Sequence, residues 1–320
     1  MPAFKPASTS GPARLRIGTR GSMLALAQAA EVRARLAAAD PALDEPGVVE
    51  TLAIRTSGDA VTDRPLADAG GKGLFTKEID AALLDGRIDL AVHSMKDMES
   101  RLVPGIVVAA VLPREDPRDV LIAPAAKSIA GLARGARVGT SSVRRRAQLL
   151  ALRPDLQIVP FRGNVNTRLA RFDAGAADAI VLAQAGLHRL GVTRADVSVL
   201  EPDEMLPSAA QGAIAVACRA DDDATRALLA ALDDRGSRLC VMAERALLAA
   251  LDGSCRTPIA ALARLDGDAL ALDALVASHD GREVFRTSRR GAAADGEAMG
   301  RDAGQELRRR APAALFADIG

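Results

Sequence analysis

The sequence contains no tryptophan and no tyrosine, and only 6 of its 320 residues are phenylalanine. Proteins that bind single-stranded nucleic acids usually stack bases on aromatic side chains, so the composition nearly excludes that mode of binding. An excess of positive charge is also missing, because 42 Lys and Arg face 41 Asp and Glu, giving a formal net charge of +1. Nucleic-acid-binding domains usually have a large basic excess, so we expect no nucleic-acid partner.

Cysteine is equally scarce. Cys218, Cys240 and Cys255 are too few and too scattered for a disulfide framework or a metal site. No apolar run approaches the roughly 18 residues of a membrane span. Residues 1–13 are rich in Pro, Ser and Ala and lack the apolar core of a signal peptide, so we expect a disordered leader and a cytoplasmic protein with no membrane contact.

Lysine accounts for only five of the 42 basic residues, which leaves 37 arginines. Coding bias in a GC-rich genome would explain this total, and it would also explain the abundant alanine and glycine. The positions of the arginines are a separate question. The length allows two or three domains, and 49% hydrophobic residues are enough to form their cores.

From Leu15 onward, short apolar runs alternate with segments of helical periodicity, which is typical of α/β units on largely parallel sheets. The expected strands are Leu15–Gly18, Val48–Ile54, Ile88–Val92, Ile106–Leu112, a strand ending at Arg137–Gly139, Leu156–Pro160 and Ala179–Leu182. The expected helices are Ser22–Ala39, Thr76–Leu84, Ser142–Leu152, Thr167–Ala174 and Ala185–Leu190. The pattern restarts after Arg118 and therefore predicts two α/β lobes.

The C-terminal part has a different pattern. A helix over Ala243–Leu251 precedes three β-like runs, which are Ile259–Leu265, Ala269–Val276 and Glu283–Thr287. The runs are joined by two Asp-Gly pairs, which are hairpin signals. An Arg-rich helix follows from about Glu297 to Arg309, so we predict a third, small α+β domain with an antiparallel sheet.

Hydroxyl groups and arginines gather where the expected strands end. In open α/β sheets, ligands bind at the carboxyl ends of strands. Five such ends carry these residues: Arg20–Ser22, Arg55–Ser57, His93–Asp97, Thr140–Arg145 and Arg162–Asn164. A single one could be only a helix N-cap, but five indicate a ligand with several negative charges, held by helix N-termini and Arg side chains.

The sequence does not match either of two common nucleotide-binding motifs. Gly70-Gly71-Lys72-Gly73 resembles a P-loop, but Leu66 stands where that motif needs its first glycine, and no Gly-x-Gly-x-x-Gly follows a strand. Carboxylate groups are therefore favoured over nucleotide phosphate.

Asp97 is the best candidate for acid–base or electrostatic catalysis, because it follows a buried strand. A helix N-cap and an ion pair with Lys96 are equally open interpretations of this residue. His93 is expected to be structural. Cys255 lies in a tight loop where Arg256 could lower its pKa, so both a reactive and an inert thiol remain possible, whereas Cys218 and Cys240 lie in apolar runs and are expected in the core.

Eight segments resemble the porphobilinogen deaminase family, in the family's order. The seven besides the Cys255 loop are Arg16-Ile-Gly-Thr-Arg-Gly-Ser22, Gly71-Lys-Gly-Leu-Phe-Thr-Lys-Glu78, Ala91-Val-His-Ser-Met-Lys-Asp97, Arg114-Glu-Asp-Pro-Arg-Asp119, Gly139-Thr-Ser-Ser-Val-Arg-Arg145, Arg162-Gly-Asn-Val-Asn-Thr-Arg168 and Leu206-Pro-Ser-Ala-Ala-Gln-Gly212.

The resemblance implies a fold and a reaction. The fold would be α/β, with two lobes like type II periplasmic binding proteins and a small α+β domain with a three-stranded antiparallel sheet. The implied domains are 14–113 with 213–232, then 114–212, then 233–320. The family joins four porphobilinogen molecules head to tail, with loss of ammonia, on a dipyrromethane cofactor, and hydrolysis releases hydroxymethylbilane. The implied enzyme is a monomeric transferase of tetrapyrrole (haem) biosynthesis that needs no metal.

The resemblance also implies roles for individual residues. Cys255 would carry the cofactor through a thioether, and Asp97 would stabilise the azafulvene cation left when ammonia departs. The other implied cofactor-binding residues are Ser94, Lys96, Thr140, Ser142, Arg144, Arg145, Arg168 and Arg189. The implied substrate-binding residues are Arg20, Ser22, Gln28, Arg162, Arg168, Arg189 and Gln211, with Lys72 and Phe75 in the active-site loop.

Three departures from the family pattern stand out. Asp68 replaces a frequent lysine, Met98-Glu99 replaces a Val-Pro pair, and Gly18 replaces a frequent alanine. An alternative to the enzyme is a non-catalytic receptor for small carboxylates on the same two-lobe fold, but such a receptor would have no use for the Cys255 loop.

Overall fold

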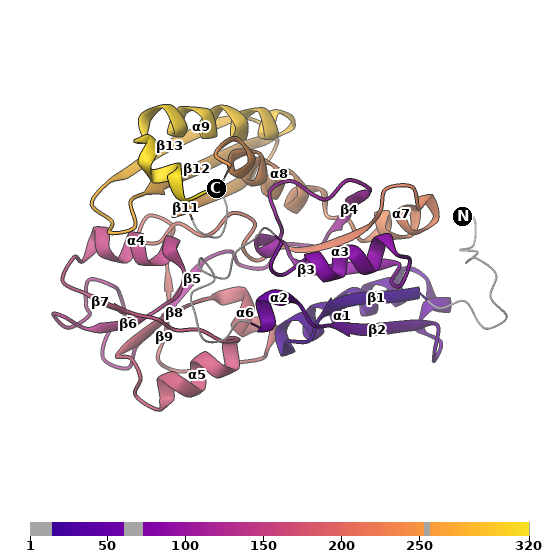
Figure 1. Cartoon of the computed structure of the whole chain (residues 1–320), viewed down its shortest axis with the longest axis horizontal. Helices are drawn as coiled ribbons and strands as arrows, with labels where there is room; N and C mark the ends of the chain where they lie inside the picture. Colours follow the sequence, from indigo (N-terminus) through magenta and orange to yellow (C-terminus); the bar gives the residue numbers. More distant parts are fainter. Residues whose placement is uncertain (1–14, 61–72, 253–256, 320) are drawn as a thin grey trace. The chain divides into compact units, whose positions relative to one another are not determined.

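The computed structural model describes residues 15–60, 73–252 and 257–319 of the chain (Figure 1). These residues pack into two compact units. The first contains residues 15–60, 73–114 and 213–238, and the second contains residues 115–212, 239–252 and 257–319. The expected leader, residues 1–13, lies outside the described residues.

A five-stranded sheet forms the centre of the first unit. Its strands are β1 (Leu15–Arg20), β2 (Val49–Ile54), β3 (Leu90–Ser94), β4 (Ile106–Val111) and β10 (Ile214–Arg219), in the order β2-β1-β3-β10-β4. Strand β1 runs parallel to β2 and β3, whereas β10 is antiparallel to β3 and β4. The carboxyl ends of β1 and β3 therefore lie at the same edge of the sheet.

Helices cover both faces of this sheet. On one face, α1 (Met23–Ala39) buries Val32 and Leu36 against Leu15 and Val92. On the other face, α3 (Lys77–Leu84) buries Ile79 and Leu83 against Ile88 and Ala91. The short helix α2 (Ser57–Ala60) follows β2, and α7 (Asp223–Leu229) follows β10. Burial on both faces explains the continuous apolar run that predicted strand β3.

The second unit contains a sheet of the same design. Its strands are β5 (Asp119–Ile122), β6 (Arg137–Gly139), β7 (Gln157–Val159), β8 (Ala179–Ala183) and β9 (Val197–Leu200), in the order β7-β6-β8-β5-β9. Strand β6 is parallel to β7 and β8, and β5 is antiparallel to β8 and β9. Helices α4 (Val143–Leu152), α5 (Val165–Asp173) and α6 (Gln184–Arg189) follow β6, β7 and β8 in turn.

A three-stranded antiparallel sheet completes the second unit. It contains β11 (Ile259–Asp266), β12 (Ala269–Ala277) and β13 (Val284–Ala292). Helix α9 (Gly296–Arg310) and the second half of α8 (Arg235–Ala250) pack on one face of it (Figure 1). The predicted fold class is thus confirmed: two α/β sheets with one strand order, and a separate antiparallel sheet.

Some predicted bounds were wrong. Helix α8 begins at Arg235 rather than Ala243, and its first turn, residues 235–238, contains no apolar residue that would have predicted the earlier start. Strand β13 continues to Ala292, beyond its predicted end at Thr287. The prediction ended too early because exposed Arg and Ser residues alternate along the outer face of the strand, which does not give the apolar pattern of a buried strand. Within the described residues, no helix is both long and apolar enough to cross a membrane.

Close packing of α9 against α8 depends on glycine. A Cβ atom at Gly300 would lie 2.1 Å from the carbonyl oxygen of Ala243, which is backbone and cannot move aside. We expect Gly300→Ala to lower the free energy of unfolding by about 1–3 kcal/mol, despite the higher helix propensity of alanine.

Urea denaturation would measure this loss. Gln305→Ala, at an exposed position of the same helix, is the matched control and should change stability by less than about 0.5 kcal/mol. Equal stability of Gly300→Ala and the parent would show that the two helices are not in close contact.

Candidate active site

Asp97 lies just beyond the carboxyl end of β3. The turn Met95–Asp97 follows the strand directly, and the fully buried Met95 anchors it by donating its backbone N–H to the carbonyl of Ala213 at 3.0 Å. The side chain of Asp97 keeps 32% of its surface exposed. The turn that carries this side chain is thus anchored, and the side chain itself is partly accessible.

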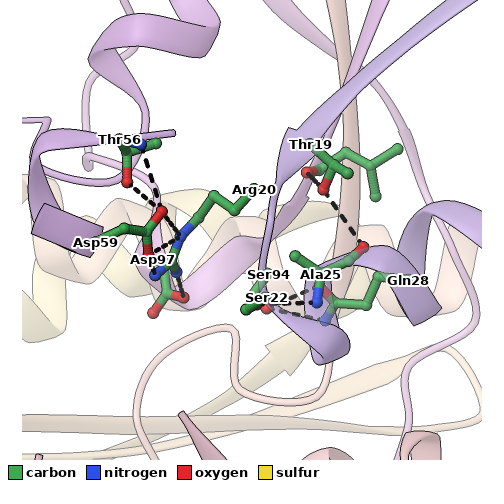
Figure 2. A network of polar contacts seen from close by, with 10 residues as sticks. Thr19, Arg20, Ser22, Ala25, Gln28, Thr56, Asp59, Ser94 and Asp97 are labelled. Carbon is green, nitrogen blue, oxygen red and sulfur yellow. Dashed lines mark hydrogen bonds and ion pairs between the residues drawn. The ribbon is translucent and has the colours of Figure 1, made fainter. Parts of the chain in front are cut away.

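Arg20, at the end of β1, links Asp97 to a second carboxylate (Figure 2). Its NH1 nitrogen lies 3.7 Å from Oδ2 of Asp97, and its Nε donates to Oδ1 of Asp59 at 3.2 Å. The guanidinium carbon also lies 4.2 Å from the centre of the Phe75 ring. One arginine thus serves two carboxylates and an aromatic ring, which leaves this group with a net charge of −1 when both acids are ionised.

Asp59 was not among the predicted site residues. Burial raises the pKa of its carboxyl group, but hydrogen bonds from Arg20 and Thr56 lower it by more, so the net pKa is below its usual value. Thr56 donates its hydroxyl to Asp59 at 2.7 Å. The sequence analysis predicted a ligand-binding strand end at Arg55–Ser57, but it did not include Asp59, which follows two residues later.

Gln28, Ser94 and Ser22 tie helix α1 to the same edge of the sheet (Figure 2). The buried Gln28 donates its amide to the hydroxyl of Ser94 at 2.8 Å. Ser22 is the N-cap of α1, and its hydroxyl oxygen accepts from the backbone N–H of Ala25 at 3.2 Å. These three predicted residues therefore lie together with Arg20 and Asp97 where β1 and β3 end.

His93 lies on β3 and is only 5% exposed. Burial, together with the positive charge of Arg20, lowers the pKa of its imidazole to about 4. In the unfolded chain the group would take up a proton near its ordinary pKa of 6.5, so between these values the unfolded state binds more protons.

Acid should therefore destabilise the protein in this range. We expect the free energy of unfolding to fall by about 3 kcal/mol more in the parent than in His93→Gln as the pH drops from 6.5 to 4. His279→Gln, a change at a partly exposed histidine, should keep the steep pH dependence of the parent. Parallel curves for the parent and His93→Gln would mean that His93 is charged in the folded state.

A buried ionic cluster lies at the start of α4 in the second unit. Arg144 and Arg145 are each 5% exposed, and Asp119 is fully buried. Oδ2 of Asp119 lies 2.7 Å from NH1 of Arg144, and Oδ1 accepts from NH2 of Arg145 at 2.8 Å. Gln211 also donates to Oδ1 at 2.8 Å. Burial raises the pKa of Asp119, but the charges of the two arginines outweigh it and hold the pKa well below its usual value.

Two guanidinium groups against one carboxylate leave this cluster with a charge of +1. Among the described residues, the buried Nε atoms of Arg144 and Arg145 have no hydrogen-bond acceptor. Two hydroxyls lie at the start of the same helix, because Ser142 caps α4 through the backbone N–H of Arg145 and Thr140 accepts from the N–H of Ser142 at 3.1 Å. A bound carboxylate would balance this positive charge.

The remaining predicted arginines belong to the same sheet edge as this cluster. Arg162 lies between β7 and α5, and Arg168 on α5 donates its Nε to the carbonyl of Gly163 at 2.8 Å. Arg189, the last residue of α6, donates to the carbonyl of Gly212 at 2.9 Å. Each follows the carboxyl end of a parallel strand, β7 or β8. The strand-end pattern predicted Arg162, whereas Arg168 and Arg189 were implied by the resemblance alone.

Two predicted residues, Cys255 and Lys72, lie outside the described residues, and so does Asp68. The other two cysteines are buried, as expected, and burial raises the pKa of the Cys218 thiol to about 11. Among the described residues, no group of three or more His, Cys, Asp or Glu could hold a metal ion.

The solved structures that resemble this chain are remote. The VFT2 domain of BvgS from Bordetella pertussis is 15% identical, with a TM-score of 0.41 over 71% of this chain and 93% of that domain. A periplasmic binding protein of Brucella ovis, solved with glutathione bound, is 16% identical, with a TM-score of 0.42 over 74% of this chain and 68% of that protein.

In sequence, by contrast, the chain is closely similar to proteins of one family. The family model for the "dipyromethane cofactor binding domain" of porphobilinogen deaminase matches residues 15–227, and the model for its C-terminal domain matches residues 238–309. A porphobilinogen deaminase of Paracoccus denitrificans is 56% identical over 302 residues, which cover 94% of this chain and 96% of that protein. A chloroplastic one of Oryza sativa subsp. japonica is 52% identical over 306 residues, covering 94% and 85%. The chain therefore belongs to the porphobilinogen deaminase family.

Proposed function

We propose that this protein is an enzyme of tetrapyrrole biosynthesis, a transferase that joins four porphobilinogen molecules head to tail with loss of ammonia and then releases hydroxymethylbilane by hydrolysis. The observation that carries the proposal is the partly exposed carboxylate of Asp97, held 3.7 Å from Arg20 at the sheet edge, in a chain of this family.

The residues at the start of α4 fit a dipyrromethane cofactor. Each pyrrole ring of that group bears two carboxylates, and the cluster of Arg144, Arg145 and Asp119 has a net charge of +1. When bound, the cofactor supplies the pyrrole end to which substrate units are added. We propose that Cys255 holds it through a thioether, and that the other cofactor-binding residues are Ser94, Lys96, Thr140, Ser142, Arg144, Arg145, Arg168 and Arg189.

Asp97 has the charge and the position to act on porphobilinogen. When the C–N bond of the protonated aminomethyl group breaks, the nitrogen leaves with the electron pair as ammonia, and the positive charge passes to the pyrrole ring. The carboxylate of Asp97 would face the pyrrole N–H and stabilise that charge. Because Arg20 is shared between Asp59 and Asp97, the group keeps its net negative charge and favours a cation.

Arg20 has two tasks in this proposal. It orients Asp97, and it would bind a substrate carboxylate. The other residues proposed to bind substrate are Ser22, Gln28, Arg162, Arg168, Arg189 and Gln211. Gln211, however, donates its amide to Asp119 and to the carbonyl of Pro117, so it contributes by holding the arginine cluster in place.

Three domains are proposed, with the bounds 14–113 plus 213–232, 114–212 and 233–320. The pairing of β10 with β3 and β4 supports placing residues 213–232 with the first domain. We further propose a monomer located in the cytoplasm.

The purified protein, incubated with porphobilinogen, tests the proposal. We expect one ammonia released for each porphobilinogen consumed, and a product with the mass of hydroxymethylbilane. Binding of porphobilinogen without its consumption would contradict the proposed enzyme and favour the carboxylate receptor.

A further inference from the structure

Glu99 makes a contact that the proposed mechanism does not use. Its Oε1 accepts a hydrogen bond from the backbone N–H of Gly73 at 2.7 Å, although 26 residues separate the two. Glu99 stands two residues after Asp97, and Gly73 stands two residues before Phe75. The bond therefore connects the segment of the proposed catalytic carboxylate to the segment of the aromatic ring beside Arg20.

Gly73 lies in a turn whose carbonyl group is also held by hydrogen bonds. Its φ angle of +74° lies in the left-handed region that favours glycine. Its carbonyl accepts from the N–H groups of Thr76 and Lys77 at 3.0 and 2.9 Å, where α3 begins. With the N–H bound by Glu99, both polar groups of this peptide position are occupied, so the direction of the chain into Leu74 and Phe75 is set.

Phe75 is held closely after that turn. The N–H of Gly58 donates to the carbonyl of Leu74 at 2.6 Å, and a Cβ atom at Gly58 would lie 2.4 Å from the ring of Phe75. The ring in turn lies 4.2 Å from the guanidinium carbon of Arg20, whose NH1 faces Asp97 at 3.7 Å. Figure 2 shows this last pair.

These contacts form a closed ring from Asp97 through Arg20, Phe75 and Gly73 to Glu99, which returns to Asp97 along the chain. We infer that Glu99 is a positioning residue for Asp97: its carboxylate fixes the Gly73 turn, so that Phe75 supports Arg20 in the orientation that holds Asp97. The inference rests on the proposed function and names a residue that acts through others, without touching the substrate.

Three variants test the hydrogen bond itself. Glu99→Ala removes the acceptor, Glu99→Gln keeps an acceptor oxygen, and Glu45→Ala removes an exposed glutamate of the same unit as a control. In the holoprotein, amide hydrogen exchange of Gly73, followed by NMR, should become about tenfold faster in Glu99→Ala. It should stay within about threefold of the parent in Glu99→Gln and Glu45→Ala.

Kinetics test the link to Asp97. We expect Glu99→Ala to lower kcat for porphobilinogen about tenfold with little change in KM, and Glu99→Gln to restore most of the loss. Phe75→Leu should lower kcat by a similar factor without changing exchange at Gly73. If Glu99 acts through Phe75, the double variant should lose no more than the larger single loss, whereas independent roles would multiply the two losses.

The outcomes separate the inference from the proposed function. Parent-like exchange at Gly73 in Glu99→Ala, or multiplied losses in the double variant, would overturn the positioning role. If Glu99→Ala does not fold, Glu99→Met, which keeps the length of the side chain but has no oxygen acceptor, decides it by the same exchange at Gly73 and the same kinetics. A parent protein that consumes no porphobilinogen would overturn the proposed function, and the exchange rates would still report whether Glu99 holds the turn.

Discussion

Asp97→Asn is expected to reduce turnover of porphobilinogen to below the level of detection, a loss of at least about 10²–10³ in kcat. Asparagine keeps the size of the side chain and an oxygen toward Arg20, but it removes the negative charge. The group of Arg20, Asp59 and residue 97 then changes from a net charge of −1 to zero, and the developing cation loses its counter-charge. Ammonia release from the holoprotein in a single turnover would measure the effect.

Two further measurements make this result specific to Asp97. Asp85→Asn, at an exposed position in the same unit, should leave turnover unchanged. Intact mass should show that Asp97→Asn still carries its cofactor, because the cluster of Arg144, Arg145 and Asp119 is untouched. Near-normal formation of hydroxymethylbilane by Asp97→Asn would refute its assigned role.

The sequence predicted most of the fold because burial leaves periodic patterns. Strand β3 is buried on both faces and reads as a continuous apolar run, and β11, β12 and β13 are separated by Asp-Gly turns. Strand β5 was missed, since it has only four residues and begins with the charged Asp119. Strand β9 was missed as well, because Val197–Leu200 is short and only half-buried.

The candidate site was predicted motif by motif, but its internal connections were not. Arg20, Asp97, Arg144 and Arg145 were chosen because they follow strands. Their partners Asp59 and Asp119 are set by tertiary packing, and Gln211 meets Asp119 across 92 residues of sequence. A buried carboxylate is rare, yet nothing in a local pattern distinguishes it from an exposed one. Glu99 left only one sequence signal, its departure from the family's Val-Pro pair.

Cys255→Ala is expected to abolish both cofactor attachment and activity. In the proposed attachment, a sulfur–carbon bond forms while the aminomethyl C–N bond of porphobilinogen breaks, and the thiol hydrogen leaves with the nitrogen as ammonia. Intact mass of the parent should therefore exceed the polypeptide mass by two porphobilinogen units, each less one ammonia. Cys255→Ala should have the polypeptide mass alone and form no hydroxymethylbilane.

The other cysteines cannot replace Cys255 in this reaction. The thiolate is the nucleophile, and burial that raises the pKa of Cys218 to about 11 leaves almost none of it ionised near neutral pH. Cys240 is only 7% exposed, so Cys240→Ala is the matched control and should keep the added mass. A carboxylate receptor predicts the opposite of the enzyme at each step: its parent protein would have the bare polypeptide mass, and Cys255→Ala would bind porphobilinogen as well as the parent does.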